Sequence, residues 1–225
     1  MFPSERLSLA ERYTAWLADA GVVRGLIGPR EVPRLWERHV LNCAVVNEAL
    51  PSTPFTLCDI GSGAGLPGLV LAIMRPDAEI TLVEPLLRRT DFLTEVADDL
   101  GLSNVTVHRG RAEDLAGLQQ FDVVTSRAVA PLDRLLRWSM PLVAPTGQLV
   151  AMKGSSAAEE IETHAGVLKK LRCAPPTIQS VGAGVVDPQT TVVRVSWADP
   201  SRVSLPGAGR RTGSPSGKKN QRKRR

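Results

Sequence analysis

A run of glycines follows an acidic residue early in the chain. Residues 57–68 read LCDIGSGAGLPG, in which Asp59 precedes Gly61, Gly63 and Gly65. Glycine permits the tight turns and the close backbone approach that a bound nucleotide needs, and Pro67 suits the first turn of a helix. We therefore predict a ligand-binding loop between a strand and a helix.

The spacing and the charge of this loop discriminate between nucleotides. A dinucleotide motif of the form G-x-G-x-x-G requires a small third residue at position 66, where Leu66 stands. Asp59 would repel a pyrophosphate, whereas it would attract the sulfonium and ammonium groups of S-adenosylmethionine, and the loop amides would bind its carboxylate. The pattern favours S-adenosylmethionine as the cofactor.

Two later segments extend the same site. ITLVEP places Glu84 about twenty residues after the loop, at a strand end where a carboxylate accepts hydrogen bonds from a ribose diol. Strand three is followed by GRAEDL, which would place Ala112 and Glu113 beside an adenine ring. Glu84 alone would also fit a surface acid, but the three segments together predict a methyltransferase.

The methyl acceptor is indicated by what the fourth strand end contains. TSRAVAPL stands where methylases of exocyclic amines carry a turn of the form Asn or Asp, Pro, Pro, aromatic. Methylation of a pyrimidine carbon needs a cysteine nucleophile, but Cys58 lies inside a strand and not at a strand end. A ring nitrogen with a lone pair, such as guanine N7, needs neither feature. Arg127 would anchor the methionine carboxylate, a phosphate or the O6 edge of guanine, or would pair with a neighbouring acid on the surface. Lys153 is a weaker candidate for a phosphate contact.

The elements around these residues predict an α/β fold. From Phe55 onward, short apolar runs alternate with helical stretches, which is typical of a doubly wound sheet covered on both faces. We expect strands at 55–60, 80–84, 104–108, 121–126, 146–152, 176–182 and 190–197, and helices near 67–75, 87–100, 111–117, 131–140 and 156–172. No helix separates the last two strands, so we predict a seven-stranded sheet of the class I S-adenosylmethionine-dependent methyltransferase type whose final pair is antiparallel. Ligands of such sheets bind beyond the carboxyl ends of the strands.

Two helices, at 8–20 and 31–50, precede the sheet. The second contains Arg38 and His39, and His39 shares an apolar stripe with Leu35 and Cys43. That pattern fits a buried core histidine better than a catalytic one. We divide the chain into an N-terminal helical extension (1–50), a methyltransferase domain (51–198) and a disordered basic tail (199–225).

Charge is distributed unevenly along the 225 residues. Residues 201–225 hold nine Lys and Arg and no acid, which leaves 19 basic and 23 acidic residues in 1–200. A Gly, Ser and Pro-rich basic tail predicts nucleic acid as the partner, or else a solubilising tail or a targeting address. Three isolated cysteines indicate neither a disulfide framework nor a metal site, and we expect a cytoplasmic monomer that does not bind a membrane.

The quoted motifs resemble a known family. DIGSGAGLPG, RPDAEITLVEPLLRRTDFL, GRAEDL, SRAVAPL and MKG, with RHVLNC upstream, are similar to the ribosomal RNA small subunit methyltransferase G family, formerly glucose-inhibited division protein B, over about residues 5–197. The resemblance implies methylation of guanine N7 in 16S ribosomal RNA with S-adenosylmethionine, and streptomycin resistance when the activity is lost. It implies cofactor contacts from Gly61, Leu66, Ala112, Glu113 and Arg127, and a place in the cleft for Arg38 and His39. Glu84 stands where the family often has Asp.

Two other functions are compatible with the residues alone. One is a methyltransferase of a small molecule, with a tail that only solubilises the chain. The other is a non-catalytic nucleotide-binding module that docks on RNA.

Overall fold

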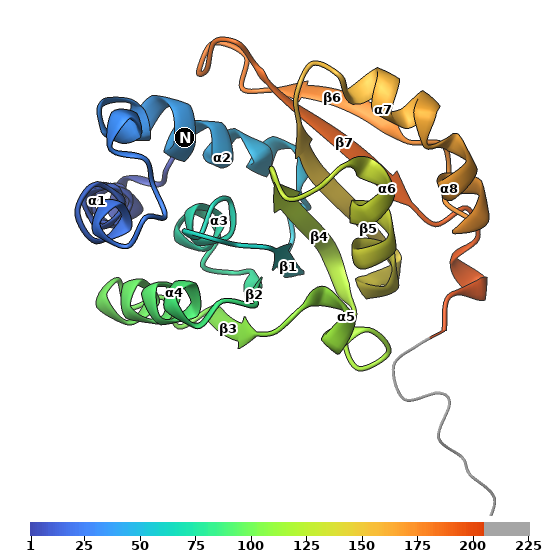
Figure 1. Cartoon of the computed structure of the whole chain (residues 1–225), viewed down its shortest axis with the longest axis horizontal. Coiled ribbons are helices and arrows are strands. Elements are labelled where there is room, and N and C mark those ends of the chain that lie inside the picture. Colours follow the sequence, from blue (N-terminus) through green and yellow to red (C-terminus); the bar gives the residue numbers. More distant parts are fainter. Residues whose placement is uncertain (205–225) are drawn as a thin grey trace, which may run out of the picture.

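The computed structural model describes residues 1–204, which form one seven-stranded sheet with helices on both faces (Figure 1). The strands are β1 (Thr56–Ile60), β2 (Glu79–Glu84), β3 (Val105–Arg109), β4 (Phe121–Arg127), β5 (Val143–Lys153), β6 (Thr177–Val181) and β7 (Thr190–Ser196). Their spatial order is β3-β2-β1-β4-β5-β7-β6, and β7 is antiparallel to both of its neighbours while the other neighbouring pairs are parallel. The predicted doubly wound sheet and its antiparallel final pair are confirmed. The order reverses between β1 and β4, so the loops after these two strands flank the crevice where ligands bind.

The helices of the sheet domain alternate with the strands. They are α3 (Gly68–Met74), α4 (Leu87–Asp99), α5 (Ala112–Leu115), α6 (Leu132–Ser139), α7 (Ala157–Thr163) and α8 (Ala165–Lys170), with a 3₁₀ turn η6 (Met140–Leu142) after α6. The last helix, which we expected to be continuous, divides at His164, whose ψ of 17° departs from helical geometry just before Gly166. Glycine and histidine are weak helix formers, which accounts for the division.

Side chains alternate between two cores, one on each face of the sheet. Leu57 of β1 and Leu82 of β2 belong to the core under α3 and α4, whereas Cys58 and Ile60 belong to the core under α5, α6 and α8. Since successive residues of a strand point to opposite faces, Asp59 shares the face of Leu57. This parity directs Asp59 toward α3.

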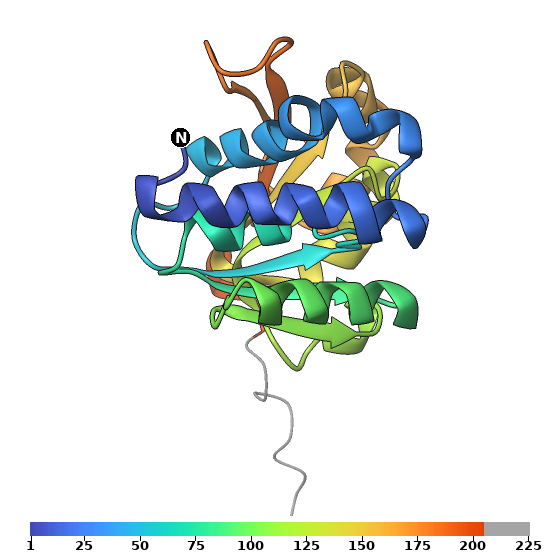
Figure 2. The same cartoon turned by 90° about the vertical axis from the view of Figure 1, so that its left-hand side faces the viewer.

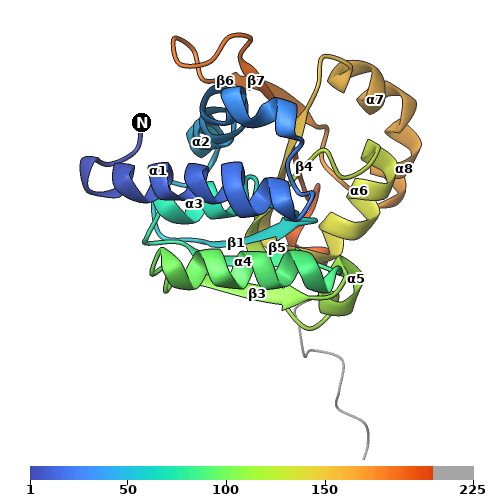
Figure 3. The same cartoon turned by 60° about the vertical axis from the view of Figure 1, so that its left-hand side comes forward.

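The N-terminal fifty residues pack over the α3 face of the sheet. They comprise η1 (Ser4–Arg6), α1 (Leu7–Trp16), η2 (Leu17–Gly21), η3 (Pro29–Arg34), η4 (Leu35–Leu41), α2 (Asn42–Ala44) and η5 (Val45–Ala49). The second predicted helix is thus a succession of 3₁₀, π and α turns, with Pro33 inside the first of them. Figure 2 shows the two helical stretches side by side, and Figure 3 shows α1 over α3. Tyr13, Leu17 and Leu35 are fully buried there, so these helices complete the core.

The short element η7 (Pro200–Arg202) ends the described part of the chain. Most of the predicted basic tail, 205–225, lies outside the described residues. Within residues 1–204, no helix is both long and apolar enough to cross a membrane.

Candidate cofactor and acceptor site

The loop after β1 is a compact turn that is fixed by backbone hydrogen bonds, both within the loop and to β2. Gly61 and Gly65 have φ of 69° and 96°, and a Cβ added to them would lie 2.9 Å from a methyl of Val129 and 2.4 Å from a methyl of Leu69. The Gly61 and Ser62 amides both donate to the Val83 carbonyl, at 2.8 and 3.1 Å. The Gly65 and Leu66 amides donate to the Ser62 carbonyl. The glycines therefore serve the turn, and these amides are bonded within the chain.

Asp59 lies behind this loop and is fully buried. Its Oδ2 accepts a hydrogen bond from the Gly68 amide at 3.0 Å, at the start of α3, and its Oδ1 has no partner among the described residues. Burial raises the pKa of Asp59 to about 7, against the opposing effect of the Gly68 bond. Asp59 therefore stabilises the junction of loop and helix, and neither it nor Gly65 belongs to the cavity lining described below.

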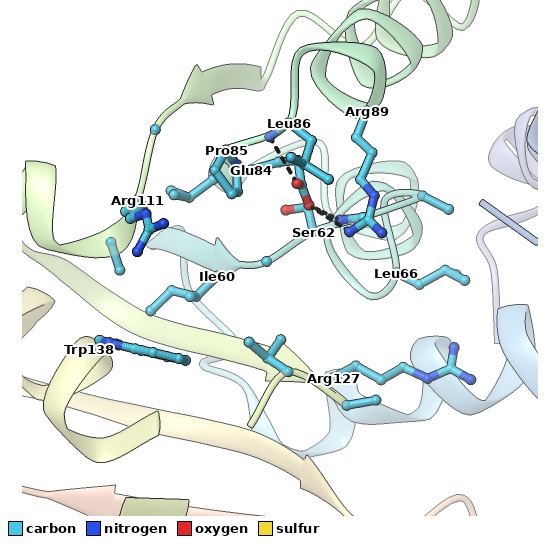
Figure 4. Close-up of a pocket in the computed structure, with 18 of the residues that line it drawn as sticks. Ile60, Ser62, Leu66, Glu84, Pro85, Leu86, Arg89, Arg111, Arg127 and Trp138 are labelled. Carbon is cyan, nitrogen blue, oxygen red and sulfur yellow. Dashed lines mark hydrogen bonds and ion pairs between the residues drawn. The ribbon is translucent and has the colours of Figure 1, made fainter. Parts of the chain in front are cut away.

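Glu84 closes the loop from the neighbouring strand. Its Oε2 accepts from the Gly63 amide and its Oε1 from the Leu86 amide, both at 3.1 Å, and Arg89 lies 3.4 Å from Oε2. The side chain is only 2% exposed, and it lines the cavity (Figure 4). A buried carboxylate fixed by two amides presents its remaining lone pairs in one direction.

These residues surround a first cavity of about 640 Å³. Its lining includes Gly61, Gly63, Leu66, Glu84, Ala112, Glu113 and Arg127 from our predictions, together with Leu26, Ile27, Ile60, Pro85, Leu86, Val129 and Trp138. The walls are mainly apolar, and their charged groups are the carboxylates of Glu84 and Glu113 and the guanidinium groups of Arg89, Arg111 and Arg127 (Figure 4). A ligand with a flat ring, a diol and a charged amino-acid end fits such a set of groups. The residues present therefore fit S-adenosylmethionine.

A second, larger cavity of about 1340 Å³ meets the first at Arg127. Its lining includes Arg34, Trp36 and Arg38 from the N-terminal helices, the loop after β4, and residues 185–191, which lead from the β6–β7 connection into the start of β7. Arg127 and the following residues, Ala128 and Val129, belong to the linings of both cavities. Ala128 adopts a positive φ of 53°, which is uncommon for a residue with a side chain. This turn is the partition between the cavities.

Lys153, our weaker candidate for a phosphate contact, lines the second cavity and is also bonded within the chain. Its ammonium donates to the Ala130 carbonyl at 3.1 Å and to Glu160 Oε2 at 2.7 Å, and Glu160 also accepts from the Leu132 amide. Burial acts to raise the pKa of Glu160, but the bond from Lys153 gives a net lowering. This ion pair therefore holds the partition from the β5 side.

The structure brings Arg38 to the rim of the second cavity and His39 into contact with Arg127. It also adds residues that the sequence did not single out for the site. The buried Tyr13 hydroxyl donates to the Ala64 carbonyl at 2.8 Å and so fixes the glycine loop. Trp138 lines the first cavity and Trp36 the second. Nothing in the local pattern of an aromatic residue distinguishes a core from a cavity wall.

Solved structures of other proteins share this fold. An S-adenosylmethionine-dependent methyltransferase from Aquifex aeolicus superposes with a TM-score of 0.53 at 18% identity, covering 75% of this chain and 98% of that one. A ribosomal protein L11 methylase from Lactobacillus delbrueckii subsp. bulgaricus gives 0.52 at 14% identity, covering 70% and 76%. The fold is therefore that of the class I S-adenosylmethionine-dependent methyltransferases.

Sequence comparison identifies the family. The family model described as rRNA small subunit methyltransferase G (GidB) matches residues 6–189. A relative of that name from Nocardioides sp. (strain JS614) is 58% identical over 231 residues, covering 99% of this chain and 92% of the relative. One from Streptomyces coelicolor is 59% identical over 192 residues, covering 85% and 80%. The chain belongs to the rRNA small subunit methyltransferase G family.

Proposed function

We propose that this chain methylates N7 of a guanine in the 16S ribosomal RNA of the small subunit, in the cytoplasm. The observation that carries the proposal is the position of Arg127, in the lining of both a cofactor-sized cavity and a larger one. Methyl transfer requires donor and acceptor to meet in line at one point. The partition after β4 is such a meeting point.

In the first cavity, the chain supplies complementary groups to each part of the cofactor. S-adenosylmethionine provides an electrophilic methyl group on a sulfonium. Glu84 would accept the ribose hydroxyls, and Ala112 and Glu113 would border the adenine ring. Because the loop amides named above are bonded within the chain, the methionine carboxylate would pair with an arginine of the lining, a role that we assign to Arg127. Asp59 would act through the loop it supports, since it lies outside the lining.

In the second cavity, the proposed acceptor needs no general base. Glu160 is held in an ion pair with Lys153, and its pKa is lowered by that bond although burial opposes the change. Guanine N7 carries a free lone pair, so the chain has only to position the base and exclude water. Trp36 is an aromatic wall on which a base would stack.

The rim of the second cavity is suited to an RNA strand. Arg34 and Arg38 are exposed and four residues apart, and Arg38 keeps 58% of its side chain accessible despite an ion pair to Glu31 at 3.5 Å. Phosphate contacts from arginines of this kind provide affinity that weakens as salt rises. The basic residues beyond 204 would add to this salt-dependent affinity for RNA.

The proposal is tested with small subunits from cells that lack the protein. Incubation with labelled S-adenosylmethionine should transfer methyl to one guanine, mapped by primer extension after cleavage at N7-methylguanine. Arg127→Ala should abolish turnover while circular dichroism stays unchanged, and Arg137→Ala, an exposed arginine of α6 outside both cavities, is the matched control. Transfer to adenine, to protein or only to small molecules would overturn the proposal.

A further inference from the structure

Two side chains of the N-terminal helices, Glu31 and His39, form a hydrogen-bonded series with Arg127 of β4 behind the partition. Glu31 Oε2 lies 3.0 Å from His39 Nε2, and His39 Nδ1 lies 2.7 Å from Arg127 Nη2. The other guanidinium nitrogen, Nη1, donates to Cys43 Sγ at 3.4 Å. Four elements, η3, η4, α2 and β4, thus meet at one arginine.

The donors and acceptors in this series of hydrogen bonds fix the tautomer and the protonation state of His39. A guanidinium has no acceptor atom, so His39 Nδ1 must carry a lone pair to accept from Arg127. The proton of a neutral ring is then on Nε2, where it is donated to the Glu31 carboxylate. Each group therefore has the partner it requires only when His39 is neutral and protonated at Nε2.

Arg127 has few other means of holding its position. Its side chain is long and loses much rotamer freedom when it is fixed, and thiol sulfur is a weak acceptor. Burial raises the pKa of Cys43 to about 11, so this thiol stays neutral and adds no charge. The His39 nitrogen is accordingly the stronger of the two protein acceptors recorded for the guanidinium.

We propose that His39 is a positioning residue that holds Arg127 between the two cavities, with Glu31 selecting its tautomer. Protonation of His39 places an N–H against the guanidinium N–H and releases Arg127. Methyl transfer then declines on the acid side through His39 rather than through any group that contacts substrate. The inference rests on the proposed role of Arg127.

The charges around the ring agree with this direction. The charged groups near His39 and its partners are Glu31 and Arg34 of η3, Arg38 of η4 and Arg127 of β4. Cys43 of α2 and Tyr13 of α1, which lie near Arg127, are neutral. Burial is the main cause that lowers the pKa of His39, and Arg127 and Arg38 add to it, while Glu31 opposes it. The neutral ring is therefore the form favoured near neutral pH.

Two substitutions of His39 distinguish its hydrogen bond with Arg127 from its hydrogen bond with Glu31. His39→Asn places an amide oxygen near the position of Nδ1 and keeps an acceptor for Arg127, whereas His39→Gln places its amide near the position of Nε2 and keeps only the contact with Glu31. Loss of one hydrogen bond to a charged group predicts about a 10–100-fold fall in kcat for His39→Gln at pH 8. His39→Asn should stay within a few-fold of the parent and should lose the acid limb of the pH profile. His164→Asn, at the α7–α8 junction, is the matched control and should leave the profile unchanged.

A direct measurement of the ring does not depend on activity. Long-range ¹H–¹⁵N correlation spectra of the full-length protein at pH 7.5 should show His39 as the neutral Nε2–H tautomer. Calorimetry should show weaker S-adenosylmethionine binding in His39→Gln but not in His39→Asn. A cationic ring, the Nδ1–H tautomer, or equal losses in Asn and Gln variants would overturn the inference. If the parent protein methylated no RNA, the proposed function would fail, while the spectra and the cofactor affinities would still decide the role of His39.

Discussion

Glu84 offers the sharpest test of the cofactor site, through the single-atom change Glu84→Gln. Both carboxylate oxygens accept a backbone amide, from Gly63 and from Leu86, and Arg89 adds a charge at 3.4 Å. An amide side chain keeps one of these bonds and turns its NH₂ group toward the other N–H, so that a buried donor faces a donor. It also removes the charge that would hold the ribose hydroxyls.

The expected loss follows from these contacts. A hydrogen bond to a charged group contributes about 1.5–3 kcal/mol, and each 1.4 kcal/mol corresponds to about a tenfold change in affinity. We expect S-adenosylmethionine to bind about 10–100-fold more weakly, as measured by titration calorimetry. Glu79→Gln is the matched control, since Glu79 begins the same strand, is exposed and lies at the opposite end from the cavity. A folded Glu84→Gln protein that binds the cofactor within twofold of the parent would refute the ribose contact.

Two further substitutions test the support of the loop. Gly65→Ala puts a methyl 2.4 Å from Leu69 Cδ1 at a φ of 96°, while Gly101→Ala has a φ of 64° and open space, so urea unfolding should show Gly65→Ala about 1–3 kcal/mol less stable than this control. Asp59→Asn keeps an acceptor for the Gly68 amide but removes the charge. Because burial raises the folded pKa of Asp59 to about 7, above its unfolded value, its contribution to stability is full below about pH 4 and is lost as pH rises through 7. The variant should therefore gain stability relative to the parent as the pH rises from 5 to 8. A difference in unfolding free energy that stays constant over this range would contradict the raised pKa of Asp59. Unchanged cofactor affinity would show that Asp59 supports the loop rather than the cationic end of the ligand.

The sequence alone was sufficient for the order of elements and for the strand ends. Alternation of short apolar runs with helical stretches is local, and it predicted seven strands whose bounds differ from the observed ones by at most a few residues. The glycine spacing and the position of Glu84 at the end of β2 are also local, so the first cavity was expected where it lies. Family motifs extended this prediction to the reaction.

Tertiary packing decided which of these residues face the cavities. Strand parity and the position of α3 turned Asp59 inward, and packing paired Lys153, the weaker candidate for a phosphate contact, with Glu160. His39 of η4 and Arg127 of β4 meet only in the folded chain, and Tyr13 reaches Ala64 because α1 covers α3. Such contacts depend on distances between elements that are far apart in the chain, and a periodic pattern fixes which face a residue occupies but not what packs against it.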